Sequence, residues 1–282
     1  MTVELAWDVR CKTGESPVWD AANRRLLFCD IPNATIHAFP VDGRATQSWA
    51  LPEVVGAFGL CRFGRLVVAL RHRVVLFDPP TGRVEEFSDP VDEPETNRLN
   101  DGKVGPDGCF WIGSMDESPA HQPTGNLYRV RPDGVVERKA EGYVTSNGLA
   151  WSPDGRTLFH SDSRRAYIEA WDFDPATGRL SSHRRVITLN EQEGRPDGGA
   201  CDAEGCYWSS GVSAGCLNRI APDGKLLHKL PMPVAAPTMP CFAEETLYVT
   251  SLRHDETDPR AGGLFRMKAP VAGAPVGLFA DR

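Results

Sequence analysis

A short pattern that recurs six times along the chain constrains its fold most. Each copy is an apolar, strand-like run that follows a turn, and one apolar position marks each copy: Leu26, Leu66, Phe110, Leu158, Tyr207 and Leu247. Neighbouring markers are 40 to 49 residues apart. A repeat of this length, made of short strands and turns, is typical of β-propeller blades rather than of helical solenoids. The sequence therefore predicts an all-β fold, a six-bladed β-propeller with four-stranded antiparallel blades around a central channel, forming a single domain over residues 1–282.

The turns between the repeated strands are rich in Asp, Pro and Gly. Three of them, 106–108, 153–155 and 203–205, precede a marker strand and end in Gly. Glycine adopts positive φ readily and Asp hydrogen-bonds its own turn, so we assign the aspartates of such turns, for example Asp107 and Asp154, to turn formation and not to metal binding. No segment has helical apolar periodicity over three turns. We expect the first strand to pair beside the last blade and so close the ring.

The composition is that of a folded, acidic protein. Hydrophobic residues make up 41% and charged residues 24%, and the formal net charge is −7. This charge argues against nucleic acid or an anionic membrane as a partner. No apolar run approaches the roughly 18 residues that span a bilayer, and the N-terminus lacks the pattern of a signal peptide. We expect a cytoplasmic protein and, because a closed ring can exist alone, a monomer.

Eight cysteines are scattered along the chain, and several lie inside apolar strands. None belongs to a CxxC pair, so we do not expect a zinc–thiolate site. The sequence instead predicts buried thiols in a reducing compartment.

Four polar segments interrupt the repeat where a blade would not need polar side chains. They are 13–17, 97–101, 145–149 and 195–199. Each places a polar residue 10 or 11 positions before its marker, and these residues are Glu15, Asn100, Asn147 and Asp197. Equal offsets in different blades mean equal depth along the propeller axis. We therefore expect the four side chains to converge at one end of the channel.

Glu15, Asn147 and Asp197 together offer two carboxylates and an amide oxygen. Such an all-oxygen site with a net charge of −2 suits one hard divalent cation, and Ca²⁺, Zn²⁺, Mn²⁺ and Fe²⁺ all stay open. The alternative is a hydrogen-bonded network that plugs the channel. That alternative needs a shared proton or a cation to relieve the like charges.

The motifs 98–103, 111–115, 146–149 and 196–198, taken in order, resemble those of the SMP-30/gluconolactonase family, which includes regucalcin and bacterial sugar lactonases such as xylonolactonase. The resemblance covers nearly the whole chain and implies a six-bladed propeller with one divalent metal in the channel. By resemblance, Glu15, Asn147 and Asp197 match the metal ligands, and Asp197 also matches the catalytic base. Arg98 and Asn100 match residues that contact sugar hydroxyls.

The resemblance implies a metal-dependent lactonase that opens a 1,4- or 1,5-aldonolactone to the aldonic acid in sugar catabolism. Two alternatives stay open, a calcium-binding regucalcin-like regulatory propeller and a phosphotriesterase-like hydrolase. The polar pair Arg98 and Asn100 favours a polyhydroxy substrate. The chain has no HExxH motif that would indicate other hydrolytic chemistry. Whether the substrate is also contacted by Ser118, which replaces a glutamate of the regucalcin branch, or by His160, His254 or the loop 88–96, is left open.

Overall fold

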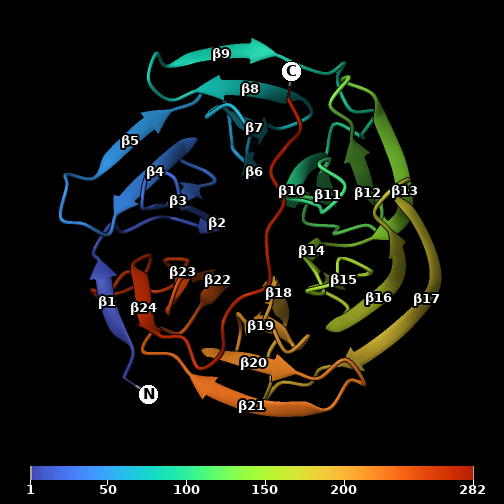
Figure 1. Ribbon diagram of the computed structural model, residues 1–282. Coiled ribbons are helices and arrows are strands. Elements are labelled where there is room, and N and C mark those ends of the chain that lie inside the picture. Colours follow the sequence, from blue (N-terminus) through green and yellow to red (C-terminus); the bar gives the residue numbers. More distant parts are fainter. Residues whose placement is uncertain (1, 282) are drawn as a thin grey trace.

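The computed structural model describes residues 2–281, which form six four-stranded antiparallel sheets arranged as the blades of a β-propeller (Figure 1). The predicted fold is confirmed. Blades 1 to 3 consist of β2(Gly14–Asp20), β3(Arg25–Asp30), β4(Thr35–Pro40) and β5(Gln47–Ala50); β6(Ala57–Leu60), β7(Leu66–Ala69), β8(Val74–Asp78) and β9(Arg83–Glu86); and β10(Asn97–Val104), β11(Phe110–Asp116), β12(Gly125–Val130) and β13(Val136–Tyr143).

The second half of the ring repeats the same order of strands. Blades 4 to 6 consist of β14(Ser146–Trp151), β15(Thr157–Asp162), β16(Tyr167–Asp174) and β17(Arg179–Thr188); β18(Pro196–Cys201), β19(Tyr207–Gly211), β20(Cys216–Ile220) and β21(Leu226–Pro231); and β22(Pro237–Ala243), β23(Thr246–Ser251) and β24(Leu264–Lys268) with β1(Glu4–Trp7). No helix occurs in 2–281, and hence none that is long and apolar enough to cross a membrane.

The N-terminal strand closes the ring, as expected. β1 pairs antiparallel with β24, so the last blade takes its outer strand from the start of the chain. This pairing gives the final blade four strands, as in every other blade. The ends of the chain thereby hold the ring together without a covalent link.

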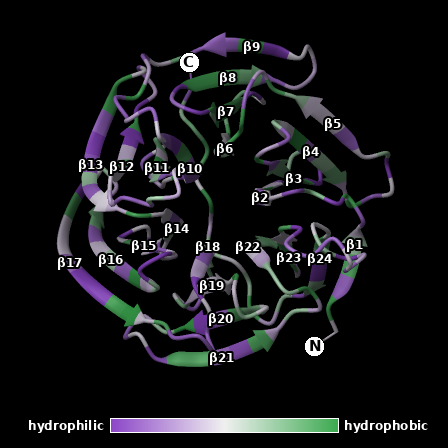
Figure 2. Ribbon diagram, turned by 180° about the vertical axis from the view of Figure 1, so that it is seen from behind, coloured by the Kyte–Doolittle hydropathy of each residue, from purple (hydrophilic) through white to green (hydrophobic). Residues whose placement is uncertain are grey.

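The apolar core is divided among the six junctions between blades. Six buried clusters each combine side chains from two neighbouring blades, and the sixth joins blade 6 to blade 1. The innermost strands β10 and β14 are almost wholly buried, whereas the outer strands β9 and β17 are mostly exposed. Hydrophilic residues accordingly gather on outer strands such as β13 and β17 (Figure 2). Stacking of blades, rather than a single central core, stabilises the fold.

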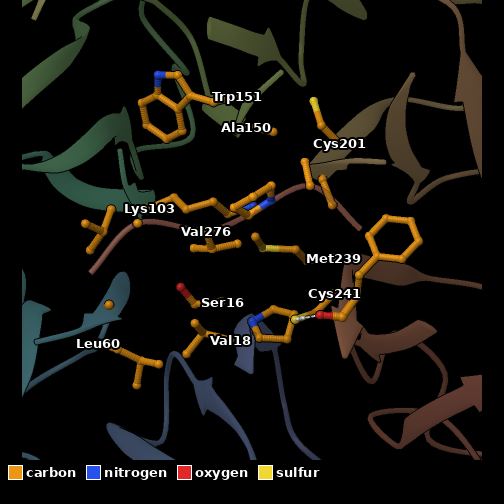
Figure 3. A pocket seen from close by; sticks show the side chains of 18 of the residues that line it. Ser16, Val18, Leu60, Lys103, Ala150, Trp151, Cys201, Met239, Cys241 and Val276 are labelled. Atoms are coloured by element: carbon orange, nitrogen blue, oxygen red, sulfur yellow. Dashed lines mark hydrogen bonds between the residues drawn. The ribbon is translucent and has the colours of Figure 1, made fainter. Parts of the chain in front are cut away.

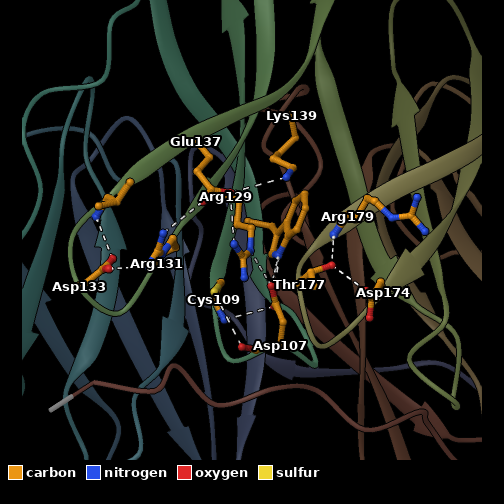
Figure 4. Close-up of polar contacts among 12 residues, drawn as sticks. Asp107, Cys109, Arg129, Arg131, Asp133, Glu137, Lys139, Asp174, Thr177 and Arg179 are labelled. Atoms are coloured by element: carbon orange, nitrogen blue, oxygen red, sulfur yellow. Dashed lines mark hydrogen bonds and ion pairs between the residues drawn. The ribbon is translucent and has the colours of Figure 1, made fainter.

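The turn aspartates have structural partners. Asp107 accepts hydrogen bonds from the Trp111 indole at 3.3 Å and from Arg129 Nε at 2.8 Å (Figure 4). Asp202 of blade 5 accepts from the Trp208 indole and the Arg219 side chain in the same way. These carboxylates fasten an inner turn to its own blade.

The segment after β24 was not foreseen from the repeat. It crosses the centre of the propeller (Figure 1) and hydrogen-bonds blade 5 through Ala274 N to Cys201 O at 2.9 Å. It then reaches blade 2 through Phe279 N to Leu60 O at 2.8 Å and blade 3 through Ala280 N to Gly108 O at 3.0 Å. Because these partners lie near the ends of the innermost strands, the segment covers the end of the channel opposite the starts of those strands. We call residues 269–281 the C-terminal strap.

A small apolar cavity of about 50 Å³ lies inside the channel next to this strap. Val18, Met239 and Val276 line it together with the aliphatic stem of Lys103 (Figure 3). Few polar atoms face this space. The polar chemistry of the channel therefore lies at its other end.

Candidate active site

The structure brings the sequence-predicted site residues together on one cavity of about 220 Å³ at the end of the channel where the innermost strands begin. The cavity is lined by all five of them, Glu15, Arg98, Asn100, Asn147 and Asp197. Gly56 lines it from blade 2, where a side chain would collide with the Leu99 carbonyl. Equal offsets from the repeat marker thus correspond to equal depth in the channel.

A β-bulge in each contributing blade aims these side chains. In blades 1, 3, 4, 5 and 6 the pairing between the innermost strand and its neighbour shifts register at this depth, whereas in blade 2 it does not. Directly after Glu15 and Asn147, the backbone takes positive φ at Ser16 (55°) and Gly148 (69°). Bulges re-aim side chains and are frequent beside active sites. The bulges here turn polar residues of otherwise buried strands toward the channel.

Three oxygen atoms are free to bind a ligand at this cavity. Asn147 Nδ2 donates to Asp197 Oδ1 at 2.8 Å and to Ser163 Oγ at 2.9 Å, and Glu15 Oε2 accepts from Ser16 N at 2.8 Å. Within 2–281, Glu15 Oε1, Asn147 Oδ1 and Asp197 Oδ2 have no hydrogen-bond partner. The hydrogen bonds fix the side chains while leaving one oxygen of each available.

The cavity holds an excess of buried negative charge. Burial, reinforced by the charges of Asp197 and Asp101, raises the pKa of Glu15 well above its ordinary value. Burial and the Asp101 charge raise the pKa of Asp197 to about 7. Among the described residues, none of the three carboxylates forms a salt bridge. Lys103 lies nearby and is half-buried, but its Nζ donates to the Gly199 carbonyl at 2.6 Å, and burial lowers its pKa.

Asp101 adds to this charge from beneath the cavity. Its Oδ2 accepts from Leu149 N at 3.1 Å, while its buried Oδ1 has no partner in the described part of the chain. A buried carboxylate oxygen without a donor is unfavourable unless a cation or a proton lies near it. The group therefore strengthens the negative potential at the base of the site.

Arg98 and Asn100 form a rigid pair at the side of the cavity. Arg98 donates from Nη1 to Asn100 Oδ1 at 2.6 Å, and Asn100 Nδ2 donates to Ser146 O at 2.9 Å. Arg98 forms an ion pair with Glu117 at 2.7 Å, and none with Asp101. Its Nη2 has no partner within 2–281 and is a free donor beside the cavity.

Residues 13–253 match the SMP-30/Gluconolactonase/LRE-like region. The chain belongs to this family. It is 34% identical over 281 residues to 6-deoxy-6-sulfogluconolactonase from Pseudomonas putida, with 95% of this chain and 94% of that protein covered. Regucalcin from Pongo abelii is 33% identical over 282 residues, covering 94% and 93%.

Solved structures agree on the architecture. The crystal structure of a calcium-binding protein, regucalcin, from Agrobacterium tumefaciens matches with a TM-score of 0.90 over 100% of this chain and 97% of that one. The identity of 24% means that this likeness shows the fold alone.

The other candidate substrate contacts of this SMP-30/gluconolactonase chain do not line the cavity. His160 is fully buried in β15 and bonds Ser146 Oγ at 2.6 Å and Glu169 at 3.1 Å, so it does not line the cavity. Ser118 donates to Asp116. Ser118, His254 and the loop 88–96 are absent from the cavity lining. Arg195 does line the cavity, and its charge partly offsets the rise in the pKa of Asp197.

The sequence analysis did not identify two residues that contribute to the site, Arg195 and Glu117. Arg195 stood inside one of the polar segments that interrupt the repeat, so its position was visible although its contribution was not. Glu117 carried no signal, because its pairing with Arg98 depends on how β11 ends.

Proposed function

We propose that this protein hydrolyses the ester of a 1,4- or 1,5-aldonolactone to the aldonic acid, with one divalent cation bound in the channel. The observation that carries the proposal is a single cavity that combines free carboxylate and amide oxygens with the free donor of Arg98. The similarity to 6-deoxy-6-sulfogluconolactonase supports a sugar lactone as the substrate class.

The residues present fit a cation. The pKa values of Glu15 and Asp197 are raised because burial and the neighbouring carboxylates disfavour their charged forms, and a bound cation would stabilise those forms. Glu15, Asn147 and Asp197 would hold it through oxygen atoms, which suit hard divalent ions. When bound, the cation would stabilise negative charge on the lactone carbonyl oxygen and lower the pKa of water. Its identity among Ca²⁺, Zn²⁺, Mn²⁺ and Fe²⁺ is for experiment.

Asp197 is the candidate general base. Asn147 holds its Oδ1, which leaves Oδ2 toward the cavity. We assign the proton of the water that attacks the lactone carbonyl carbon to the carboxylate oxygen of Asp197 that does not hold the cation. When the carbonyl–ring oxygen bond breaks, the same carboxyl returns the proton to the departing alkoxide, which becomes the hydroxyl of the aldonic acid. Water is thereby added across the ester bond, and the carboxylate is regenerated.

Arg98 and Asn100 are the candidate binding residues for the sugar. Their mutual hydrogen bond and the contacts to Glu117 and Ser146 O fix both side chains before substrate arrives. A preorganised fork of donors beside an amide that both donates and accepts recognises adjacent hydroxyl groups.

A second candidate function is calcium binding for regulation, which the similarity to regucalcin favours. It shares the cation but needs no base at position 197. A substitution at Asp197 would therefore remove a catalytic base under the hydrolase proposal, but no catalytic group under the calcium-binding proposal.

The deciding experiment is titrimetric hydrolysis of a panel of sugar lactones by metal-stripped protein, by protein resupplied with each divalent ion, and by the Asp197→Asn variant. We expect metal-dependent turnover that falls by about 10²–10⁴-fold in the variant. Asp133→Asn, which changes an exposed turn carboxylate of blade 3, is the matched control and should keep full activity. If no lactone opens faster than its spontaneous rate while calcium still binds, the hydrolase proposal fails and the binding function replaces it.

A further inference from the structure

Blade 1 contains a second cluster of metal-ligating groups, outside the channel cavity. One ligand atom each of Cys11, Asp30 and His37 lie within 4.8 Å of one another. It is the only group of three or more His, Cys, Asp or Glu side chains with this spacing in 2–281. Cys11 lies between β1 and β2, Asp30 ends β3, and His37 lies in β4. None of the three lines the candidate active site.

We propose that Cys11, Asp30 and His37 bind a borderline-soft divalent ion of the zinc class. Sulfur, nitrogen and carboxylate oxygen are the donors that Zn²⁺ takes, and a water molecule would complete four-coordination. Donor atoms around tetrahedral zinc are about 3.5 Å apart. The three side chains would therefore move inward by about 1 Å on binding. This donor set differs in kind from the oxygen-only set of the channel.

Two of the three donors have no other partner. Cys11 is 1% exposed, and its Sγ forms no hydrogen bond to another described residue. His37 is half-buried, and its Nε2 likewise forms no hydrogen bond to a described residue. His37 Nδ1 is bonded to Ser48 Oγ at 2.8 Å, an interaction that fixes the ring and leaves Nε2 as the available nitrogen. A buried thiol facing a carboxylate and a free imidazole nitrogen is an arrangement that packing alone does not require.

Blade 4 serves as an internal comparison. Asp162 there accepts from Val144 N and Thr145 N as Asp30 accepts from Lys12 N and Thr13 N, so this aspartate is a structural acceptor in both blades. The position of His37 is taken by Glu169 in blade 4, which is saturated by hydrogen bonds from two histidines. Within the part of the chain that the structure describes, only blade 1 combines the aspartate with a thiol and an imidazole nitrogen that lack such partners.

The cluster also lies at the ring closure. Cys11 N donates to Gly262 O of blade 6 at 2.9 Å, and Trp7 of β1 packs edge-on against His37 with ring centroids 5.6 Å apart. A metal ion bound here would link the segment after the closing strand to two strands of blade 1. On binding, the Cys11 thiol gives its proton to solvent, as zinc binding to cysteine requires. The expected consequence is a more stable ring closure.

The absence of a CxxC pair does not bear on this site. That pattern reports ligands adjacent in sequence, whereas these three donors come from separate strands that only the blade brings together. The expectation that the chain lacks a zinc–thiolate site is therefore what this proposal revises.

The test is spectroscopic titration of metal-free, reduced protein with Co²⁺, because thiolate–cobalt coordination gives a near-ultraviolet charge-transfer band that oxygen ligands do not give. We expect a saturable band in the native protein and in Glu15→Gln, which alters only the channel. The band should disappear in Cys11→Ala and require at least about 10-fold more Co²⁺ in His37→Gln. Zn²⁺ should displace it and raise the thermal midpoint by about 5 °C at saturation.

Cys206→Ala is the matched control, since Cys206 is a buried thiol beside the Asp202 carboxylate with no histidine partner, and it should keep the band. If Cys11→Ala does not fold, His37→Gln decides, because His37 is only half-buried and the change preserves size. Absence of the band in native protein, or an unchanged titration in His37→Gln, overturns the proposal.

Discussion

At the scale of single residues, the channel cavity is defined by carboxylates that form no salt bridge within residues 2–281. Their depth was predictable, because each blade repeats nearly the same spacing and Glu15, Asn147 and Asp197 lie 10 or 11 positions before their marker residues. The partner of Arg98 was not predictable. Its ion pair reaches Glu117, which lies after β11, and only the folded blade brings the two together.

Substitution Arg98→Lys tests the binding role of this residue. Lysine keeps the charge but loses the fork that contacts Asn100, Leu99 O and Glu117 at once. We expect the KM for the lactone to rise by about 10-fold with a smaller change in kcat. Steady-state kinetics with Arg71→Lys as the control measures this, since Arg71 pairs with the other oxygen of Glu117 but does not line the cavity. Equal effects of both variants would contradict the assignment.

At the scale of elements, the bulges convert regular inner strands into a polar site. The repeated apolar runs predicted the strands. They did not predict the bulges, because a shift of register between two strands leaves no clear pattern in the sequence. The one signal was glycine at Gly148, which carries positive φ and packs against Tyr207. Glycine occurs for several reasons in turns and strands, so the residue alone could not identify a bulge.

Gly148→Ala is expected to destabilise the protein strongly. An added Cβ would lie 2.2 Å from Tyr207 Oη at a φ of +69°, so steric overlap adds to backbone strain, and the free energy of unfolding should fall by about 3 kcal/mol. The control is Gly82→Ala, which has φ +71° but no atom within 4 Å of the added carbon and should lose only about 1 kcal/mol. Urea unfolding of both variants separates overlap from strain. Similar losses would show that the contact with Tyr207 is unimportant.

The hydrogen bonds across blade 4 predict acid sensitivity. Burial opposes ionisation of Glu169, but its bonds to His160 and His183 outweigh this and lower its pKa below the ordinary value of 4.5. The folded state therefore binds fewer protons than the unfolded state in this range, so the stabilisation is present above pH 4.5 and lost as pH falls through the lowered pKa.

Glu169→Gln removes the titrating group with little change in shape. The variant should lose less stability between about pH 5 and pH 3 than the parent, even if it is less stable at neutral pH. Denaturant unfolding across this range supplies the measurement. Parallel pH profiles for the two proteins would exclude Glu169 as the source.

At the scale of the whole molecule, the number of blades and the closing role of the first strand were predictable from the repeat. The C-terminal strap was not, because residues 269–281 contain no copy of the pattern and their partners are backbone groups on three different blades. Backbone partners leave no signature in sequence. The strap is nevertheless anchored firmly, with Phe279 fully buried in the cluster between blades 2 and 3.

Phe279→Ala should therefore lower the free energy of unfolding by about 3–5 kcal/mol. Its neighbour Leu278 is 47% exposed, and Leu278→Ala should change stability by less than about 1 kcal/mol. Guanidinium unfolding of the pair measures the contribution of the strap. A small effect of Phe279→Ala would mean that the strap rests on the ring without stabilising it.

The strap also has a kinetic consequence. With the far end of the channel covered, the cavity is a dead end, and molecules entering and leaving must share one mouth. An aldonate formed inside would block the next lactone until it departs through this mouth. Progress curves should accordingly show inhibition by the accumulated acid that added lactone relieves, as a consequence of the C-terminal strap.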